Sequence, residues 1–324
     1  MSIEHITPEP EAVERDQQAA HVNWINIAFY LILTFGLSWG IWLPLRAVGV
    51  PLGVYAAIGM FGPAAAAIIV RLVRHEGFGD AGLRLVARGM KKGGWMYLAA
   101  YVSIPLLLAI GIGLAMLTGV QHWAFASNLH QLGVTATDAL KARGQALPTG
   151  MSGDQFALIS FAGQTALAFT LGIVINMIFT FGEEFGWRGY LLPRLAPLGG
   201  VWAALITGVI WGLWHAPLII LTGYNYPGHP WLGVAMMVVF TTSLSLIFAW
   251  LRFRSGSVWP TTLAHAAING QAGFATLFLS RADSLIAAPI GIIGVLPMLA
   301  FGIWLAATGR LKPGGRSQQP VEEA

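Results

Sequence analysis

The sequence predicts an all-α polytopic membrane protein with about eight transmembrane helices in a single bundle. Hydrophobic residues make up 56% of the 324 residues and charged residues only 10%, whereas soluble proteins carry about 25% charged residues. The mean hydropathy is +0.67. A bilayer core of about 30 Å needs roughly 20 apolar residues as a helix. Eight apolar runs approach or exceed that length, at about 24–45, 54–72, 95–118, 158–182, 200–222, 231–251, 257–280 and 285–308.

The same pattern divides the chain into three parts. Residues 1–23 are acidic and lack the pattern of a signal peptide, so we expect a cytoplasmic N-terminal tail. Residues 24–308 form the predicted transmembrane domain. Residues 309–324 carry Pro-Gly-Gly and Gln-Gln-Pro, which favours a disordered cytoplasmic tail. The chain has no cysteine, which excludes disulfides, thiolate metal ligands and cysteine nucleophiles.

The basic residues between the spans predict the orientation, because cytoplasmic loops are enriched in Lys and Arg. With eight spans, fourteen of the 18 basic residues fall on the face that holds both termini. The other face receives only Arg46, Lys141, Arg143 and Arg281. We therefore expect a multi-pass protein of the cell (plasma) membrane with both termini in the cytoplasm.

Two loops between the spans are long. The loop 73–94 is basic and is expected to lie on anionic lipid headgroups. The external loop 119–157 is expected to hold a short amphipathic helix near Thr137–Arg143. Because the net charge of +4 comes from loops, we expect the lipid bilayer, and no nucleic acid, as a partner.

Ionisable residues at membrane depth are costly and therefore indicate function. The first cluster holds Glu183, Glu184 and Arg188 at the end of the fourth apolar run. Residues four apart share a helix face, so Glu184 and Arg188 can pair. Glu183 lies about 100° away around the axis and is left available. A simpler interpretation is that the pair only holds a helix end near the interface.

The second cluster is Trp211 with His215, which are four apart on the fifth span, followed by Pro217, which should bend that span. An antiparallel hairpin turning at 195–200 would bring His215 to the height of Glu183. A carboxylate and an imidazole side by side can hold and deprotonate a water molecule. The alternative is a histidine that is merely hydrogen-bonded inside the bundle.

The third cluster is His265 with Asn269, again four apart, in the seventh predicted span. Both side chains can donate hydrogen bonds to a developing oxyanion. Polar contacts between membrane helices are the alternative interpretation. Three such clusters in one bundle favour a shared site.

In this order the clusters resemble the CPBP family of intramembrane peptidases, which includes CAAX proteases, bacteriocin-processing enzymes and the eukaryotic CAAX prenyl endopeptidase. The family pattern is EExxxR, then an aromatic residue ahead of a histidine, then HxxxN or HxxxB. The usual aromatic residue is phenylalanine, so Trp211 departs from the pattern but keeps the stacking role. The resemblance covers about 155–280, the predicted peptidase core, and leaves the first three spans and the tail outside.

The resemblance implies an eight-helix endopeptidase with a membrane-embedded catalytic cavity open to the cytoplasm. Glu183 and His215 would activate a water, and His265 and Asn269 would stabilise the oxyanion. The supporting residues would be Glu184, Arg188 and Trp211.

The need for a metal stays open at this stage. A mechanism without a metal is favoured, because the sequence has no HExxH and a carboxylate can activate water unaided. The alternative is a catalytic zinc, for which Glu183, His215 and His265 would be the three protein ligands.

The expected substrate is a membrane-associated peptide or protein, either a prenylated CAAX tail or a bacteriocin-like precursor. A proton-coupled transporter is an alternative, but it would show repeats that this sequence lacks. A non-catalytic bacteriocin-immunity or scaffold protein is a third possibility. Loss of one of Glu183, His215 or His265 would have indicated it, and all three are present.

Overall fold

The computed structural model describes residues 21–85 and 94–313. The N-terminal tail up to residue 20, residues 86–93 of the basic loop and the C-terminal tail from residue 314 lie outside the described residues. Within the described ranges the fold is all-helical, as predicted, and an isolated bridge joins Trp123 to Leu279. The helices are α2 (Trp24–Ala47), α3 (Leu52–Gly59), α4 (Gly62–Val73), α5 (Trp95–Leu117), α6 (Phe125–Ala142), α7 (Gly153–Ala168), α8 (Leu171–Gly186), a π-helix η1 (Trp187–Leu191), α9 (Leu192–Leu195), a 3-10 helix η2 (Ala196–Leu198), α10 (Gly200–Trp214), α11 (Ala216–Thr222), α12 (Pro230–Ser255), α13 (Trp259–Gln271), α14 (Phe274–Phe278) and α15 (Ile292–Ala307).

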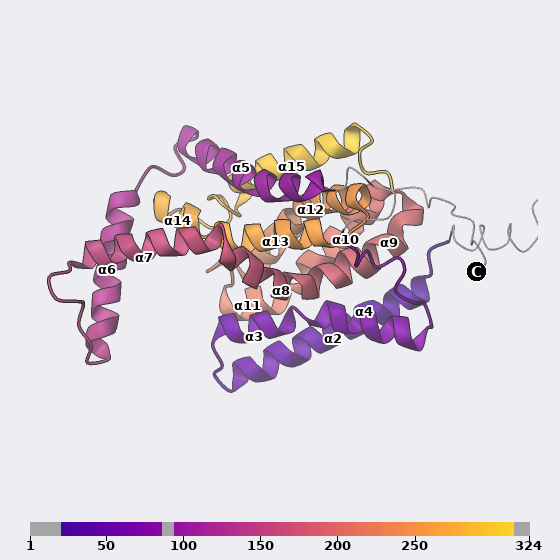
Figure 1. Ribbon diagram of the computed structural model, residues 1–324, viewed down its shortest axis with the longest axis horizontal. Helices are drawn as coiled ribbons and strands as arrows, with labels where there is room; N and C mark the ends of the chain where they lie inside the picture. The colour runs from indigo at the N-terminus through magenta and orange to yellow at the C-terminus, as the bar shows by residue number, and fades with distance from the viewer. Residues whose placement is uncertain (1–20, 86–93, 314–324) are drawn as a thin grey trace, which may run out of the picture.

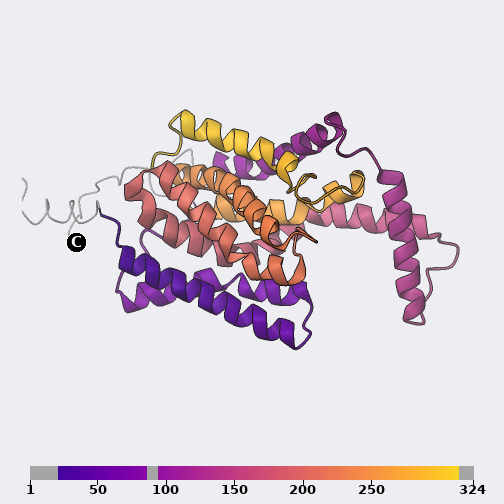
Figure 2. The ribbon, with the colours of Figure 1, turned by 180° about the vertical axis from the view of Figure 1, so that it is seen from behind.

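The helices form three layers (Figure 1). Helices α2, α3 and α4 form one outer layer, and α5 and α15 form the opposite one. The middle layer holds α8, α10, α12 and α13, and the view from behind shows the same order (Figure 2). Helices α8, α10 and α13 carry the three polar clusters. The fold therefore covers the clusters on both sides.

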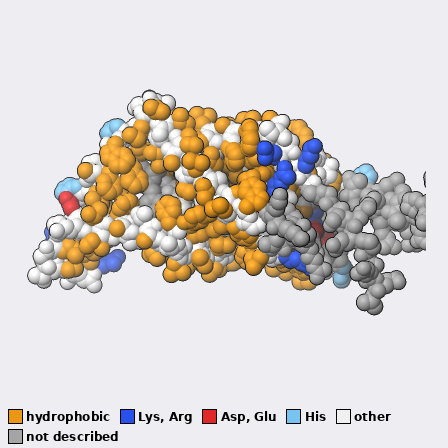
Figure 3. Space-filling view, turned by 45° about the horizontal axis from the view of Figure 1, so that its top comes forward, with side chains coloured by type: hydrophobic (Ala, Val, Ile, Leu, Met, Phe, Trp, Pro, Cys, Tyr) orange, Lys and Arg blue, Asp and Glu red, His pale blue; other side chains and the backbone are white. Residues whose placement is uncertain are grey.

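The outside of the bundle is apolar. Figure 3 shows hydrophobic side chains over most of the visible face, with Lys and Arg side chains gathered near one end. Among the exposed side chains are Ile32, Leu98 and Ile178. A broad exposed apolar surface needs a partner, and lipid supplies it for an integral membrane protein.

The number of spans differs from the sequence prediction. Among the described residues, five helical segments are long and apolar enough to cross a membrane, or six if the pair 153–168 and 171–198, bent by 56°, is one span. The seventh predicted run yields α13, with 13 residues, and the eighth yields α15, with 16. A helix of 13 residues rises about 20 Å, less than the bilayer core. The predicted count of eight is not confirmed.

Close contacts through glycine join helices both between layers and within the middle layer. A Cβ atom on Gly186 of α8 would lie 2.4 Å from the Cβ of Pro63 on α4. A Cβ atom on Gly212 of α10 would lie 2.6 Å from the Cα of Val238 on α12. Small residues let membrane helices approach closely, and these two glycines bring the clusters on α8 and α10 into the interior.

Of two local predictions, one agrees with the structure and the other differs in detail. Pro217 lies in the first turn of α11, and the helix is interrupted at His215, which agrees with the predicted bend. The amphipathic helix expected near Thr137–Arg143 is longer and is α6, which with α7 projects from one end of the bundle (Figure 1).

Candidate functional site

The buried ion pair predicted from the spacing is present. An Arg188 Nη1–H group donates to Glu184 Oε1 at 2.9 Å, and neither side chain is exposed. The same Oε1 atom lies 2.9 Å from His265 Nδ1. Glu184 therefore joins the first cluster to the third, a contact that the sequence did not predict.

Glu183 is held by two neutral donors. Its Oε2 accepts a hydrogen bond from Trp211 Nε1 at 2.6 Å and a longer one from Trp187 Nε1 at 3.4 Å. Glu183, which the helix spacing leaves without an arginine partner, thus has one of its oxygens satisfied by indole N–H groups. They add no positive charge, so Glu183 and Glu184 differ in kind: one is ion-paired and the other is hydrogen-bonded to neutral groups.

His215 contacts the other end of the same tryptophan. Its Nδ1 lies 2.9 Å from the Trp211 carbonyl oxygen. A carbonyl oxygen can only accept, so Nδ1 carries the proton, and a neutral ring leaves Nε2 as an acceptor. The His215 ring packs edge-on against Trp214, with ring centroids 4.8 Å apart. It stacks with the Tyr224 ring, with centroids 6.5 Å apart and an angle of 3° between the ring planes. Its side chain is only partly buried.

Across the hairpin between α8 and α10, the side chain that hydrogen-bonds to Glu183 is Trp211, one turn before His215. Between Glu183 and the turn of the hairpin the chain passes through the π-helix η1, which uses more residues per turn than an α-helix. No hydrogen bond joins Glu183 directly to His215 within the described ranges, and Trp211 connects them.

The two residues of the third cluster, His265 and Asn269, lie in different surroundings. His265 is buried, and its ring lies edge-on to Trp211 with centroids 5.1 Å apart. Its Nδ1 faces the ion-paired Glu184, so Nδ1 is a donor and only Nε2 remains for a substrate. Asn269, one turn further along α13, is exposed. No hydrogen bond joins it to the other site residues in the described part of the chain.

Sequence reasoning missed three residues that enclose the site. Trp187 donates to Glu183, and its spacing of four residues could have indicated this contact. The Arg188 guanidinium lies over the rings of Trp211, at 4.5 Å, and Phe248, at 4.9 Å. Neither Phe248 nor Tyr224 belongs to a recognisable motif, and only tertiary packing brings them to the site.

One end of the site is closed by arginines. The Arg188 carbonyl oxygen accepts a hydrogen bond from Arg252 Nε at 3.1 Å. The Gly189 carbonyl oxygen accepts one from Arg71 Nη2 at 2.8 Å. Both carbonyl groups belong to the π-helix η1. Both arginines are buried. Both arginines also donate to Asp80. Arg71 binds a carboxylate oxygen of Asp80 at 2.7 Å, and Arg252 binds its backbone carbonyl oxygen at 2.7 Å. The loop that follows α4 is thereby held against η1 at Asp80.

Asp80 is the charged centre of this closed end. Partial burial alone would raise its pKa, but hydrogen bonds and charges from Arg71 and Arg194 outweigh burial and hold the pKa below its usual value. Arg194 binds the second carboxylate oxygen at 2.7 Å. Asp80 is therefore ionised at neutral pH and neutralises part of the arginine cluster.

The proposed zinc ligands do not form a metal-binding group. Within the described residues no three or more His, Asp or Glu side chains are placed to hold a metal ion. Glu183 is turned to the two indoles, and the Nδ1 atoms of His215 and His265 face Trp211 and Glu184. This donor arrangement does not fit a three-ligand site, and no step is assigned to a metal.

The fold and the site define a class: an all-helical membrane protein with two adjacent buried carboxylates, two histidines and an ion-paired arginine. Residues 142–271 match the family model described as type II CAAX prenyl endopeptidase Rce1-like. The matched range includes all three clusters, in agreement with the CPBP resemblance. A comparison with curated proteins found no match.

Proposed function

We propose that the protein is an intramembrane endopeptidase of the CAAX-protease type, acting on a membrane-associated peptide or protein. The observation that carries this proposal is the difference between the two carboxylates. Glu184 is neutralised by Arg188 at 2.9 Å, whereas Glu183 has only indole donors. Two neighbouring carboxyl groups in different environments can take different roles, one structural and one as a base.

In the proposed reaction Glu183 accepts a proton from a water molecule, whose oxygen attacks the carbonyl carbon of the substrate peptide. His215 would hold that water through Nε2, since its Nδ1 faces the Trp211 carbonyl oxygen. When the C–N bond breaks, the leaving amine takes the proton that Glu183 accepted. General-base catalysis of this kind contributes about 10²- to 10⁴-fold.

His265 and Asn269 would stabilise the oxyanion. Because His265 directs Nδ1 to Glu184, it can donate through Nε2 only as an imidazolium. The neighbouring ion-paired carboxylate supports that charge. Asn269 is exposed and can turn its amide to the substrate without breaking a contact within the described residues.

The orientation remains part of the proposal. The lysine and arginine distribution supports cytoplasmic termini in the plasma membrane. The end closed by Asp80 would then lie toward the cytoplasm, since the loop that follows α4 belongs to the basic face.

The test is cleavage of a fluorogenic membrane-anchored peptide library by the detergent-purified protein. Wild type should cleave a subset of the peptides, and His215→Gln should reduce the rate by about 10²-fold or more. His130→Gln, at an exposed histidine outside the site, is the matched control and should cleave normally. A fully active His215→Gln variant would contradict the proposed role of this residue.

A second arm addresses the metal. Wild-type protein is analysed for bound zinc and assayed with and without a chelator. Stoichiometric zinc together with chelator-sensitive cleavage would replace the proposed mechanism by one in which Glu183, His215 and His265 rearrange around the ion.

A further inference from the structure

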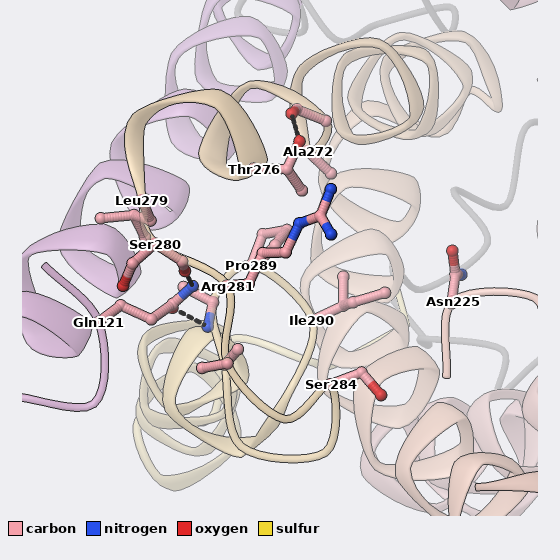
Figure 4. A pocket seen from close by; sticks show the side chains of 14 residues that line it. Gln121, Asn225, Ala272, Thr276, Leu279, Ser280, Arg281, Ser284, Pro289 and Ile290 are labelled. Carbon is pink, nitrogen blue, oxygen red and sulfur yellow. Dashed lines mark hydrogen bonds between the residues drawn. The ribbon is translucent and has the colours of Figure 1, made fainter. Parts of the chain in front are cut away.

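A cavity of about 420 Å³ lies at the end of the bundle where α5 ends and α15 begins. It is lined by the segment before α15, the end of α13 and the loop after α11 (Figure 4). Most lining groups are apolar or neutral. Arg281 is the one ionisable residue among them.

The guanidinium of Arg281 has no interaction partner among the described residues. No hydrogen bond, ion pair or ring contact joins its side chain to another residue in the part of the chain that the structure describes. Figure 4 shows the guanidinium extending past Pro289, on the side of Ala272 and Thr276. No carboxylate lines the cavity to neutralise it. The cavity therefore carries a net positive charge with free donors.

The cavity adjoins the proposed catalytic groups on two sides. Its lining residue Asn225 directly follows Tyr224, whose ring stacks with His215 at 6.5 Å. Its lining residue Ala272 directly follows α13 and is three residues beyond Asn269, a rise of about 4.5 Å. These two connections place the cavity next to the proposed catalytic groups.

We propose that this cavity is a specificity subsite in which Arg281 binds a carboxylate of the peptide substrate. The subsite rests on the proposed peptidase function, since it takes the substrate of that same site. A carboxylate is the anionic group that an unmodified peptide carries, and a planar guanidinium matches its two oxygens. The carboxylate is either a free C-terminus or an acidic side chain close to the cleaved bond.

The experiment uses three membrane-anchored peptides that share one cleavable sequence. The first ends in a free carboxylate, the second in an amide, and the third in an amide with a glutamate two residues after the cleaved bond. Wild type is compared with Arg281→Gln, Arg281→Lys and the control Arg143→Gln, an exposed arginine that does not line the cavity.

Wild type should prefer at least one carboxylate peptide over the neutral peptide by about 10- to 100-fold in kcat/KM, mainly through KM, because hydrogen bonds to charged groups contribute about 1.5–3 kcal/mol. Arg281→Gln should bring the ratio of kcat/KM between carboxylate and neutral peptides to about one, and Arg281→Lys should keep part of the preference. The preferred peptide identifies the source of the carboxylate. Arg143→Gln should behave as wild type.

Equal cleavage of all three peptides by wild type, or an unchanged preference in Arg281→Gln, would overturn the subsite. Binding of the same peptides, followed by tryptophan fluorescence, separates this failure from failure of the peptidase function. If wild type cleaves nothing but binds the carboxylate peptide more tightly than Arg281→Gln does, the subsite stands and the catalytic proposal fails.

Discussion

The two ends of the site are built in opposite ways. At one end Glu184 and Arg188 are fully buried, and Arg71, Arg252 and Asp80 fix the adjoining backbone by hydrogen bonds. At the other end His215 is partly exposed, Asn269 is exposed and Arg281 has no partner among the described residues. The difference shows that the charged groups at the closed end are paired with one another. The unpaired donors and acceptors lie at the end where a substrate can enter.

The largest effect on stability is expected at the closed end. Arg188→Met leaves Glu184 buried without its charge partner, and breaking a buried pair costs about 3–5 kcal/mol. Unfolding in detergent, followed by circular dichroism against denaturant, measures the loss. The double variant Glu184→Gln with Arg188→Met should recover part of it, because no unpaired charge remains.

A matched control for Arg188→Met is Arg46→Met, at an exposed arginine whose side chain bonds, among the described residues, only to the Leu221 carbonyl oxygen. Its stability should change by less than about 0.5 kcal/mol. If Arg188→Met and Arg46→Met were equally stable, the closed end would not depend on its buried ion pair.

The next effect concerns the tryptophan that joins the two ends. Trp211→Phe keeps an aromatic ring but removes the 2.6 Å hydrogen bond to Glu183. We expect cleavage to slow by about 10-fold or more, because a hydrogen bond to a charged group contributes about 1.5–3 kcal/mol. Trp187→Phe, which removes only the 3.4 Å contact, should have a smaller effect. Equal rates in Trp211→Phe and wild type would show that the ring alone is needed.

The smallest effect is expected at Asp80, whose side chain is 41% exposed. Asp80→Asn should destabilise the protein by at most about 1 kcal/mol at neutral pH. Since the pKa of Asp80 is lower in the folded protein, its contribution is present above the unfolded pKa of about 4 and is lost as the pH falls through the folded pKa. The stabilities of wild type and Asp80→Asn should therefore converge below about pH 4.

Unfolding measured across pH 3–7 for wild type, Asp80→Asn and the exposed control Asp138→Asn tests this pH dependence. A gap between wild type and Asp80→Asn that widens in acid would have the wrong sign for the interpretation.

The sequence predicted those contacts of the site that join residues four apart in the chain. The spacing of Glu184 and Arg188 gave their ion pair, and the spacing of Trp211 and His215 placed both at one site, because helix periodicity is local. The link between Glu184 and His265, 81 residues apart, has no local signature. The π-helix η1 was not predicted either, because nothing in the sequence pattern indicates it.

The fold was predicted at the level of class. Apolar runs indicate membrane helices, but they do not show where glycine and proline end a helix, so α13 and α15 are shorter than the runs that contain them. The side of the membrane to which the catalytic cavity opens, expected to be the cytoplasmic side, likewise stays a prediction. The cavity beside Arg281 lies at the end that the basic residues assign to the opposite face.

The most direct test of the central claim compares Glu183→Gln with Glu184→Gln in one preparation series, measuring cleavage and unfolding for each. The account predicts that Glu183→Gln loses cleavage by about 10²- to 10⁴-fold while unfolding as wild type does. It predicts that Glu184→Gln unfolds more easily, because Arg188 is left without its partner. Wild-type cleavage by Glu183→Gln, or loss of stability in Glu183→Gln with none in Glu184→Gln, would contradict the division of roles between the two carboxylates.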